Sequence, residues 1–163
     1  MELIKITTII SDFSRVILNV RNKAYKGTLN GLHYELSEKY FKYNFYDYFV
    51  FNEELLNFYK SQKPKYSLNI YTTGVIQNLP EVRKVVSPIF DNIFATIDFN
   101  TDKTKTVAYS YILERLQKPA GEILFIDDQQ ENIDAAVSAG LNCVRYTTNY
   151  ELFSILKAKF NIC

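Results

Sequence analysis

Runs of apolar and β-branched residues alternate along the chain with segments in which apolar residues recur every three or four positions. The runs predict buried strands, and the segments predict amphipathic helices. Strands are predicted at Ile4 to Ser11, Tyr66 to Tyr71, Ile93 to Ile97, Glu122 to Ile126 and Asn142 to Tyr146. Helices are predicted at Leu29 to Phe41, Asn52 to Gln62, Pro80 to Val86, Lys105 to Leu116, Gln130 to Ala139 and Asn149 to Lys157. This order predicts an α/β fold with about five parallel strands and helices on both faces.

Capping residues support several of these boundaries. Asn52 is a suitable N-cap, and Glu53 and Glu54 follow it in the first turn, where acidic side chains are favourable. Pro80 suits the first position of a helix, and Gly140 suits the residue just after a helix end.

Composition indicates an ordinary globular chain. The 163 residues are 47% hydrophobic and 23% charged, which is typical of one domain spanning 1–163. With 19 basic and 18 acidic residues, the near-zero net charge gives no reason to expect a nucleic-acid or acidic-membrane partner. Two cysteines do not indicate a disulfide framework. The apolar run before Asp12 is too short for a signal peptide or a membrane-spanning helix. We therefore expect a soluble cytoplasmic protein.

Chemically useful residues follow three predicted strands. Asp12, Thr72 and the pair Asp127-Asp128 each stand where a strand pattern ends. Ligands of open parallel sheets bind beyond the carboxyl ends of the strands. Carboxylates brought together there would repel each other, and Mg²⁺, which prefers oxygen ligands, would relieve that repulsion. The pattern therefore predicts a magnesium site at this edge of the sheet.

The same edge offers groups for a phosphate. Thr72 can donate a hydroxyl, the Thr73-Gly74 turn can present backbone N–H groups, and Lys103 can neutralise charge. Asp12 could then act as a nucleophile and form an aspartyl-phosphate. Taken singly, most of these residues have simpler interpretations, as a helix cap, a common turn or a solvated lysine. The adjacent acids after a strongly apolar strand carry the most weight, because they are costly to bury without a partner.

Four segments resemble the motifs of the haloacid dehalogenase-like hydrolases, in that family's order. Ile123 to Tyr146, ILFIDDQQENIDAAVSAGLNCVRY, resembles the fourth motif, with its paired Asp and an Asn four residues after the second. Ile9 to Leu18, IISDFSRVIL, is similar to the first motif. Tyr71 to Gly74 resembles the second motif, and Lys103, ahead of a predicted helix, resembles the third.

The resemblance implies a Rossmann-like three-layer sandwich with a mainly parallel sheet, a Mg²⁺ ion and hydrolysis of a small phosphorylated molecule. By this resemblance Asp12 would be the nucleophile and a metal ligand. Asp128 would be the direct metal ligand of the fourth motif, and Asp127 would support it. Thr72 and Lys103 would hold the phosphate.

One position departs from the first motif. Ser14 stands where the family has a second Asp, the general acid and base, and Arg15 stands where it has Gly. Serine is a poor acid or base near neutral pH, and such help is typically worth about 10²–10⁴-fold. The Ser14 carbonyl could still bind the metal. Two functions therefore stay open, a phosphohydrolase and a catalytically weak relative that binds a phosphorylated ligand or a protein.

Other interpretations fit less well. Asn19 could be set at the nucleophile position, but Asp12 follows the better strand and precedes the expected Val16-Ile17-Leu18. Hydrolysis of carbon–halogen bonds would leave the Asp127-Asp128 pair without a role. A phospho-accepting receiver domain would need its acidic pair near the N-terminus, whereas this pair comes late in the chain.

A short cap insert with about two helices is expected from Arg21 to about Gln62, and Lys23 and Lys26 lie in the basic loop after the first motif, where the insert begins. The insert is rich in aromatic residues, which we expect to pack it onto the core, the alternative being an apolar patch for a substrate or partner. For His33 we expect a surface or packing role, and for the two lysines solvation. Substrate identity and oligomeric state are not encoded in any pattern we recognise.

Overall fold

Five parallel strands form the central sheet of the computed structural model, which describes residues 5–163. Across the sheet their order is β5 (Asn92–Ala95), β4 (Ser67–Thr72), β1 (Thr8–Ser11), β6 (Ile123–Asp127) and β7 (Asn142–Arg145). Every neighbouring pair is parallel. The α/β class and the parallel sheet predicted from the sequence are confirmed, and β1 and β6 lie side by side at the centre.

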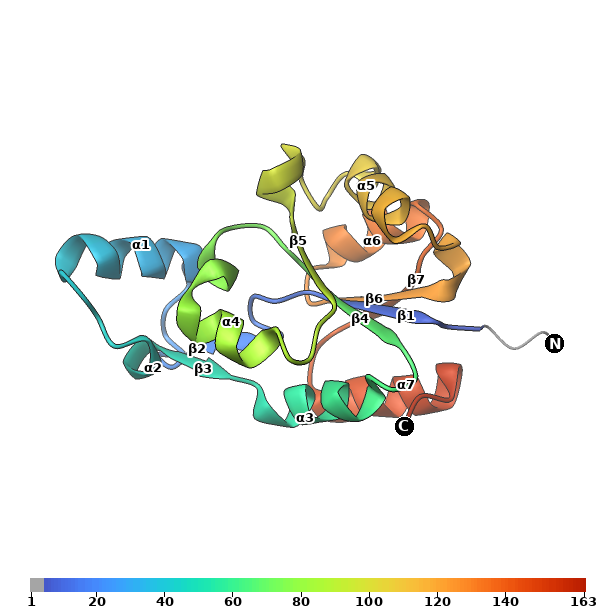
Figure 1. The fold of residues 1–163 in the computed structure, drawn as a ribbon, viewed down its shortest axis with the longest axis horizontal. Helices are drawn as coiled ribbons and strands as arrows, with labels where there is room; N and C mark the ends of the chain where they lie inside the picture. Colours follow the sequence, from blue (N-terminus) through green and yellow to red (C-terminus); the bar gives the residue numbers. More distant parts are fainter. Residues whose placement is uncertain (1–4) are drawn as a thin grey trace.

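Helices cover both faces of this sheet, as Figure 1 shows. Ile9 of β1 packs into a cluster with α3 (Glu53–Gln62), α4 (Pro80–Val86) and α7 (Asn149–Phe160). Ile10, the next residue, packs on the opposite face with α5 (Thr106–Leu116) and α6 (Gln130–Ser138). Because successive strand residues point to opposite faces and both faces are covered, these strands read as nearly continuous apolar runs.

The predicted caps are present. The Asn52 side chain accepts a hydrogen bond from the Leu55 N–H at 3.3 Å and caps α3, and α4 begins at Pro80. Gly140 follows α6 with a φ of 90°, a conformation that costs glycine little. The cap positions were therefore readable from local sequence.

Several predicted boundaries shift. The start of the first predicted strand at Ile4 lies outside the described residues, and β1 begins only at Thr8. β5 ends at Ala95 because the chain turns there into a short 3₁₀ helix, η2 (Thr96–Phe99). Two further 3₁₀ turns, η1 (Ile76–Asn78) and η3 (Ala120–Glu122), lie between the larger elements. Helix α1 (Leu29–Lys39) stops before Phe41 because the backbone at Tyr40 is extended.

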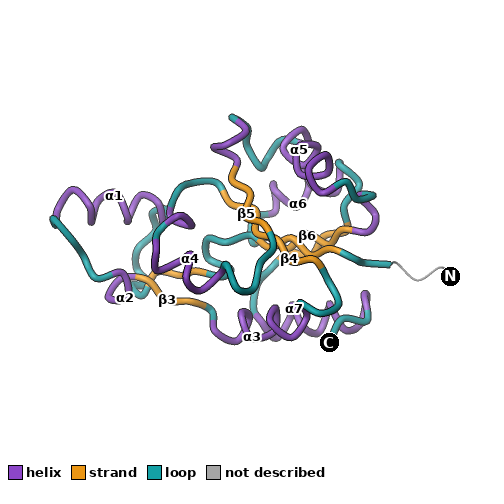
Figure 2. The backbone as a smooth tube through the Cα atoms, in the orientation of Figure 1, coloured by secondary structure: helices purple, strands orange, loops and turns teal. Residues whose placement is uncertain are grey.

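The expected insert contains more than two helices. Strands β2 (Leu18–Val20) and β3 (Phe49–Phe51) pair antiparallel, and α1 and α2 (Phe45–Tyr48) lie between them in sequence. Figure 2 shows this part projecting to one side of the sheet, while α3 runs beside α7 below it. β2, β3 and α2 were not predicted from the sequence, because three or four residues are too few to show a period.

The aromatic residues of the insert differ in burial. Phe45, Phe49 and Phe51 are buried, and the rings of Phe45 and Phe49 stack at 4.9 Å, as expected for packing residues. Four others are exposed, namely Tyr34, Tyr40, Phe41 and Tyr46. The expected packing role therefore applies to the buried aromatic residues and not to the exposed ones.

Within residues 5–163, no helix has the length and apolar character needed to cross a membrane.

Candidate active site

Three acidic residues meet where β1 and β6 end. Asp12 follows β1 directly, Asp127 ends β6, and Asp128 comes next. The parallel register pairs Ser11 with Ile126, and the Asp12 N–H donates to the Ile126 carbonyl at 2.7 Å. As a result, one carboxylate oxygen from each of the three acids lies within 4.8 Å of the others. Segments more than a hundred residues apart in sequence thus supply one acidic cluster.

Lys103 joins this cluster from the segment before α5. Its Nζ lies 2.6 Å from Asp12 Oδ1 and 2.5 Å from Asp127 Oδ2, and it donates to the Tyr71 carbonyl at 3.1 Å. These three acceptors match the three ammonium hydrogens. The lysine is only 2% exposed, so it is not the solvated side chain that lysines usually are. Burial lowers the pKa of Lys103, but the two carboxylates outweigh it and raise the pKa overall.

Asp127 is fully buried, and both of its oxygens are occupied. Asn132 Nδ2 lies 3.1 Å from each oxygen, and Oδ1 also accepts from the Gln129 N–H at 2.9 Å. With Lys103 on Oδ2, this carboxylate has donors on both sides. Asp127 therefore holds Lys103 and the turn into α6 in place.

Asp12 and Asp128 keep oxygens without a donor in the described part of the chain. Lys103 contacts Asp12 Oδ1 only, and Asp128 accepts through Oδ2 from the Gln129 side chain at 2.8 Å. Burial raises the pKa of Asp12 to about 7, while Lys103 opposes and Asp127 reinforces that rise. Burial also raises the pKa of Asp128. One lysine thus leaves three close carboxylates with uncompensated negative charge.

The cluster opens into a cavity of about 230 Å³. Four of the residues predicted from sequence line it, namely Asp12, Ser14, Lys103 and Asp128. Thr72 is not among the lining residues. It lies buried at the end of β4, and its Oγ1 has no hydrogen-bond partner within residues 5–163. The next residue, Thr73, lines the cavity instead.

Arg15 also lines this cavity, a role that the sequence analysis did not assign to it. Its φ of 63° lies in the left-handed region, which favours the glycine that the first motif carries at this position. The guanidinium donates to the Gly27 carbonyl at 2.7 Å. An arginine at the position where the first motif has glycine is the sequence feature that could have indicated this residue.

The loop before α1 and the first turn of that helix close one side of the cavity. Residues 26–30 line it, including Lys26 and Asn30. Asn30 Oδ1 accepts from the N–H groups of Val75 and Ile76, both at 2.9 Å. A Cβ at Gly74 would lie 2.2 Å from Asn30 Nδ2, so only glycine fits beside this contact. Asn30 thus ties the insert to the turn after β4, and no local pattern indicated it.

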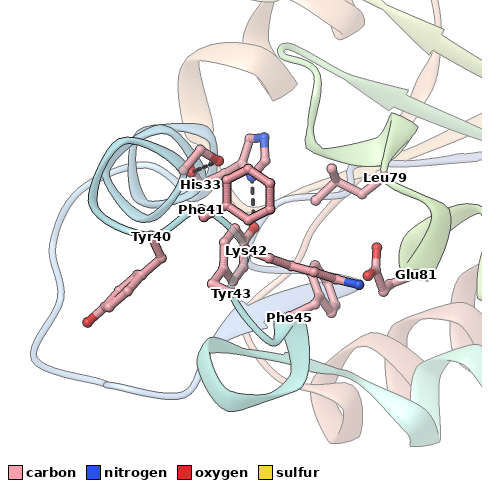
Figure 3. Close-up of a pocket in the computed structure, with 9 residues that line it drawn as sticks. His33, Tyr40, Phe41, Lys42, Tyr43, Phe45, Leu79 and Glu81 are labelled. Carbon is pink, nitrogen blue, oxygen red and sulfur yellow. Dashed lines mark hydrogen bonds between the residues drawn. The ribbon is translucent and has the colours of Figure 1, made fainter.

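His33 lies outside this site. Figure 3 shows it in a separate cavity between α1 and α4, with the aromatic side chains of the following loop. Its Nδ1 is 2.7 Å from the Tyr43 hydroxyl, and burial lowers its pKa. These contacts agree with a packing role rather than catalysis.

Comparison with known proteins agrees with the geometry. The family profile described as "haloacid dehalogenase-like hydrolase" matches residues 7–140. A predicted HAD-like family hydrolase from Porphyromonas gingivalis has a TM-score of 0.64 at 17% identity, covering 93% of this chain and 98% of its own. A HAD-superfamily hydrolase of subfamily IA from Geobacter sulfurreducens has a TM-score of 0.64 at 15% identity, with coverages of 88% and 91%.

A third similar structure contains ligands. It is a HAD family enzyme from Bacteroides thetaiotaomicron in complex with magnesium and inorganic phosphate. Its TM-score is 0.66 at 15% identity, and the match covers 91% of this chain and 99% of that one. A search among curated proteins finds no match.

Proposed function

The chain belongs to the haloacid dehalogenase-like hydrolase family, and on that premise we propose that it is a Mg²⁺-dependent phosphohydrolase of a small phosphorylated molecule. The observation that carries the proposal is how the two oxygens of the Asp12 carboxylate are contacted. Lys103 holds one carboxylate oxygen at 2.6 Å, and the other oxygen has no donor in the described residues. A carboxylate oriented in this way at a cavity wall is suited to in-line attack on phosphorus.

The acidic cluster fits a magnesium ion. Asp12 and Asp128 would hold it, with the Ser14 carbonyl as the third protein ligand, whereas Asp127 is already occupied by Lys103 and Asn132. Mg²⁺ is commonly bound through one or two carboxylates together with substrate phosphate. When bound, the ion would neutralise charge on the carboxylates and on the phosphate oxygens.

The remaining groups suit a phosphate ester. Lys103 keeps positive charge beside Asp12, and Arg15 and Lys26 add cations to the same cavity. Thr72 carries a buried hydroxyl without a partner in residues 5–163, next to Thr73 on the cavity wall. In the proposed reaction an Asp12 oxygen bonds to phosphorus as the ester oxygen leaves with its electron pair. Water then attacks the aspartyl-phosphate, which releases phosphate and restores Asp12.

Ser14 limits the proposed rate. It lines the cavity at the position where the first motif carries its second Asp, and its side chain offers no carboxylate to protonate the leaving group or to activate water. Solvent must supply those protons, so we propose a slow enzyme. The second candidate, a relative that binds a phosphorylated ligand without turnover, depends on this same residue.

An assay of phosphate release from an aryl phosphate separates the two candidates. We expect release that requires Mg²⁺, stops with EDTA and is abolished in Asp12→Asn. Asp134→Asn is the matched control, because this exposed acid on α6 lies away from the cavity and bonds only to Gln130 through its side chain. Phosphate binding without Asp12-dependent release would contradict the enzyme and favour the second candidate.

A further inference from the structure

A second cavity adjoins the proposed active site. Its volume is about 350 Å³, and residues of β2, of the segment after β2 and of β3 line it. Arg15 lines both this cavity and the acidic one, so the two share a wall. The other lining residues are Asn19, Val20, Arg21, Asn22, Lys23 and Val50. Three of the seven side chains are cationic, and none is acidic.

Two of the three cations are held in place by backbone carbonyls. Arg21 Nε donates to the Tyr46 carbonyl at 2.6 Å, and Arg15 donates to the Gly27 carbonyl at 2.7 Å. These bonds fix the orientation of the two guanidinium groups and leave their other N–H groups available. The cavity wall therefore presents oriented donors rather than freely moving charges.

No carboxylate of the described residues forms an ion pair with these cations. The ion pairs among residues 5–163 involve Lys63 and Lys103 only. Asp47 shares a different cavity with Arg21, but it makes no ion pair with it and accepts instead from Asn44 at 2.9 Å. A cleft lined by charges of one sign raises the local concentration of ligands of the opposite sign.

From this arrangement, which rests on the proposed function, we propose that the substrate carries a second anionic group. Its phosphate ester lies at Asp12, the chain of the molecule passes Arg15, and a phosphate or carboxylate at its far end binds Arg21 and Lys23. Arginine pairs well with planar or tetrahedral oxyanions, and a cavity of this size accommodates such a group with the few atoms that carry it. The substrate class is thus a small phosphate monoester that carries a second anionic group at its other end.

Binding of non-hydrolysable ligands tests this independently of turnover. We would titrate the Mg²⁺-loaded protein calorimetrically with alkane-1,n-bisphosphonates of increasing length, with the corresponding ω-phosphonocarboxylates, and with simple alkylphosphonates. At one or more lengths the ligand with two anionic groups should bind about tenfold more tightly than the alkylphosphonate, which has one. Whether the bisphosphonate or the phosphonocarboxylate binds better identifies the distal group.

Two variants assign the effect to the second cavity. Lys23→Gln and Arg21→Gln should each remove most of the advantage of the ligand with two anionic groups and leave alkylphosphonate affinity unchanged. Lys23 makes no hydrogen bond through its side chain in the described residues, so its variant keeps the local fold. Lys157→Gln, on α7, is the charge-matched control and should change nothing.

Three results would overturn the inference. These are equal affinities for ligands with one and with two anionic groups at every length, an advantage that survives both variants, or an equal loss in Lys157→Gln. Failure of every phosphonate to bind would instead remove the phosphate site itself and the inference with it. Tight bisphosphonate binding that is sensitive to Lys23, without phosphatase activity, would support the inference while contradicting the proposed enzyme.

Discussion

Replacing Lys103 by Met should destabilise the protein far more than replacing an exposed lysine. Lys103 is the only cation within 4.0 Å of Asp12 and Asp127 among the described residues, and those two carboxylates are 6% and 0% exposed. Methionine keeps the length and apolar stem of the side chain but removes the charge. Both acids would then be buried without a cation.

The size of the loss follows from burial. Breaking a buried ion pair by removing one partner typically costs about 3–5 kcal/mol, because the other charge stays buried and unpaired. Asp127 retains its bonds from Asn132 and Gln129, which favours the lower end of that range. At roughly 2–4 °C per kcal/mol for a chain of this length, the melting temperature should fall by roughly 6–15 °C.

Urea unfolding at pH 8 in EDTA measures this change without interference from metal. The control is Lys63→Met, which removes a 3.0 Å pair with Asp91 in which both side chains are about 40% exposed. Exposed pairs contribute about 0–1 kcal/mol, so the control should lose little. Combining Lys103→Met with Asp12→Asn should recover part of the stability, because a neutral amide replaces the unpaired carboxylate. Equal losses in the two lysine variants, or no recovery in the double variant, would refute the argument.

Three further predictions concern the same site. Because burial raises the folded-state pKa of Asp12 from 3.8 to about 7, its contribution to stability in EDTA is present below pH 4 and lost as the pH rises through 7. Asp12→Asn should remove this pH-dependent part of the free energy of unfolding, as measured by urea titrations at several pH values. An unchanged pH dependence in the variant would argue against the raised pKa of Asp12. Ser14→Asp should raise kcat for an aryl phosphate, by up to about 10²–10⁴-fold, and an unchanged kcat would show that proton transfer is not limiting. Asn30→Ala leaves two N–H groups without their acceptor and should cost about 1–3 kcal/mol in urea unfolding, whereas Asn30→Asp keeps the acceptor and should cost less. Equal losses in the two Asn30 variants would contradict the assigned contact.

Several features of the fold were predictable because they depend on local pattern. The apolar run ending at Asp127-Asp128 predicts β6, and the acids at its end mark the edge where ligands bind. Asn52 and Gly140 predict a helix start and a helix end, because capping is chemistry between near neighbours. The short antiparallel pair β2–β3 was missed, because three-residue strands are recognised only by their partners.

The sequence by itself determined the alternation of strands and helices and the residue types at the strand ends, since both follow from side-chain periodicity and local hydrogen bonding. Only the tertiary structure decided which of these residues meet. Lys103 lies 91 residues from Asp12 in sequence, yet its ammonium group contacts the carboxylates of both Asp12 and Asp127. Arg15, set between two cavities, and Asn30, bound to the turn after β4, were assigned in the same way. Contacts of this kind depend on how distant segments pack, and no pattern within a short stretch of chain records that.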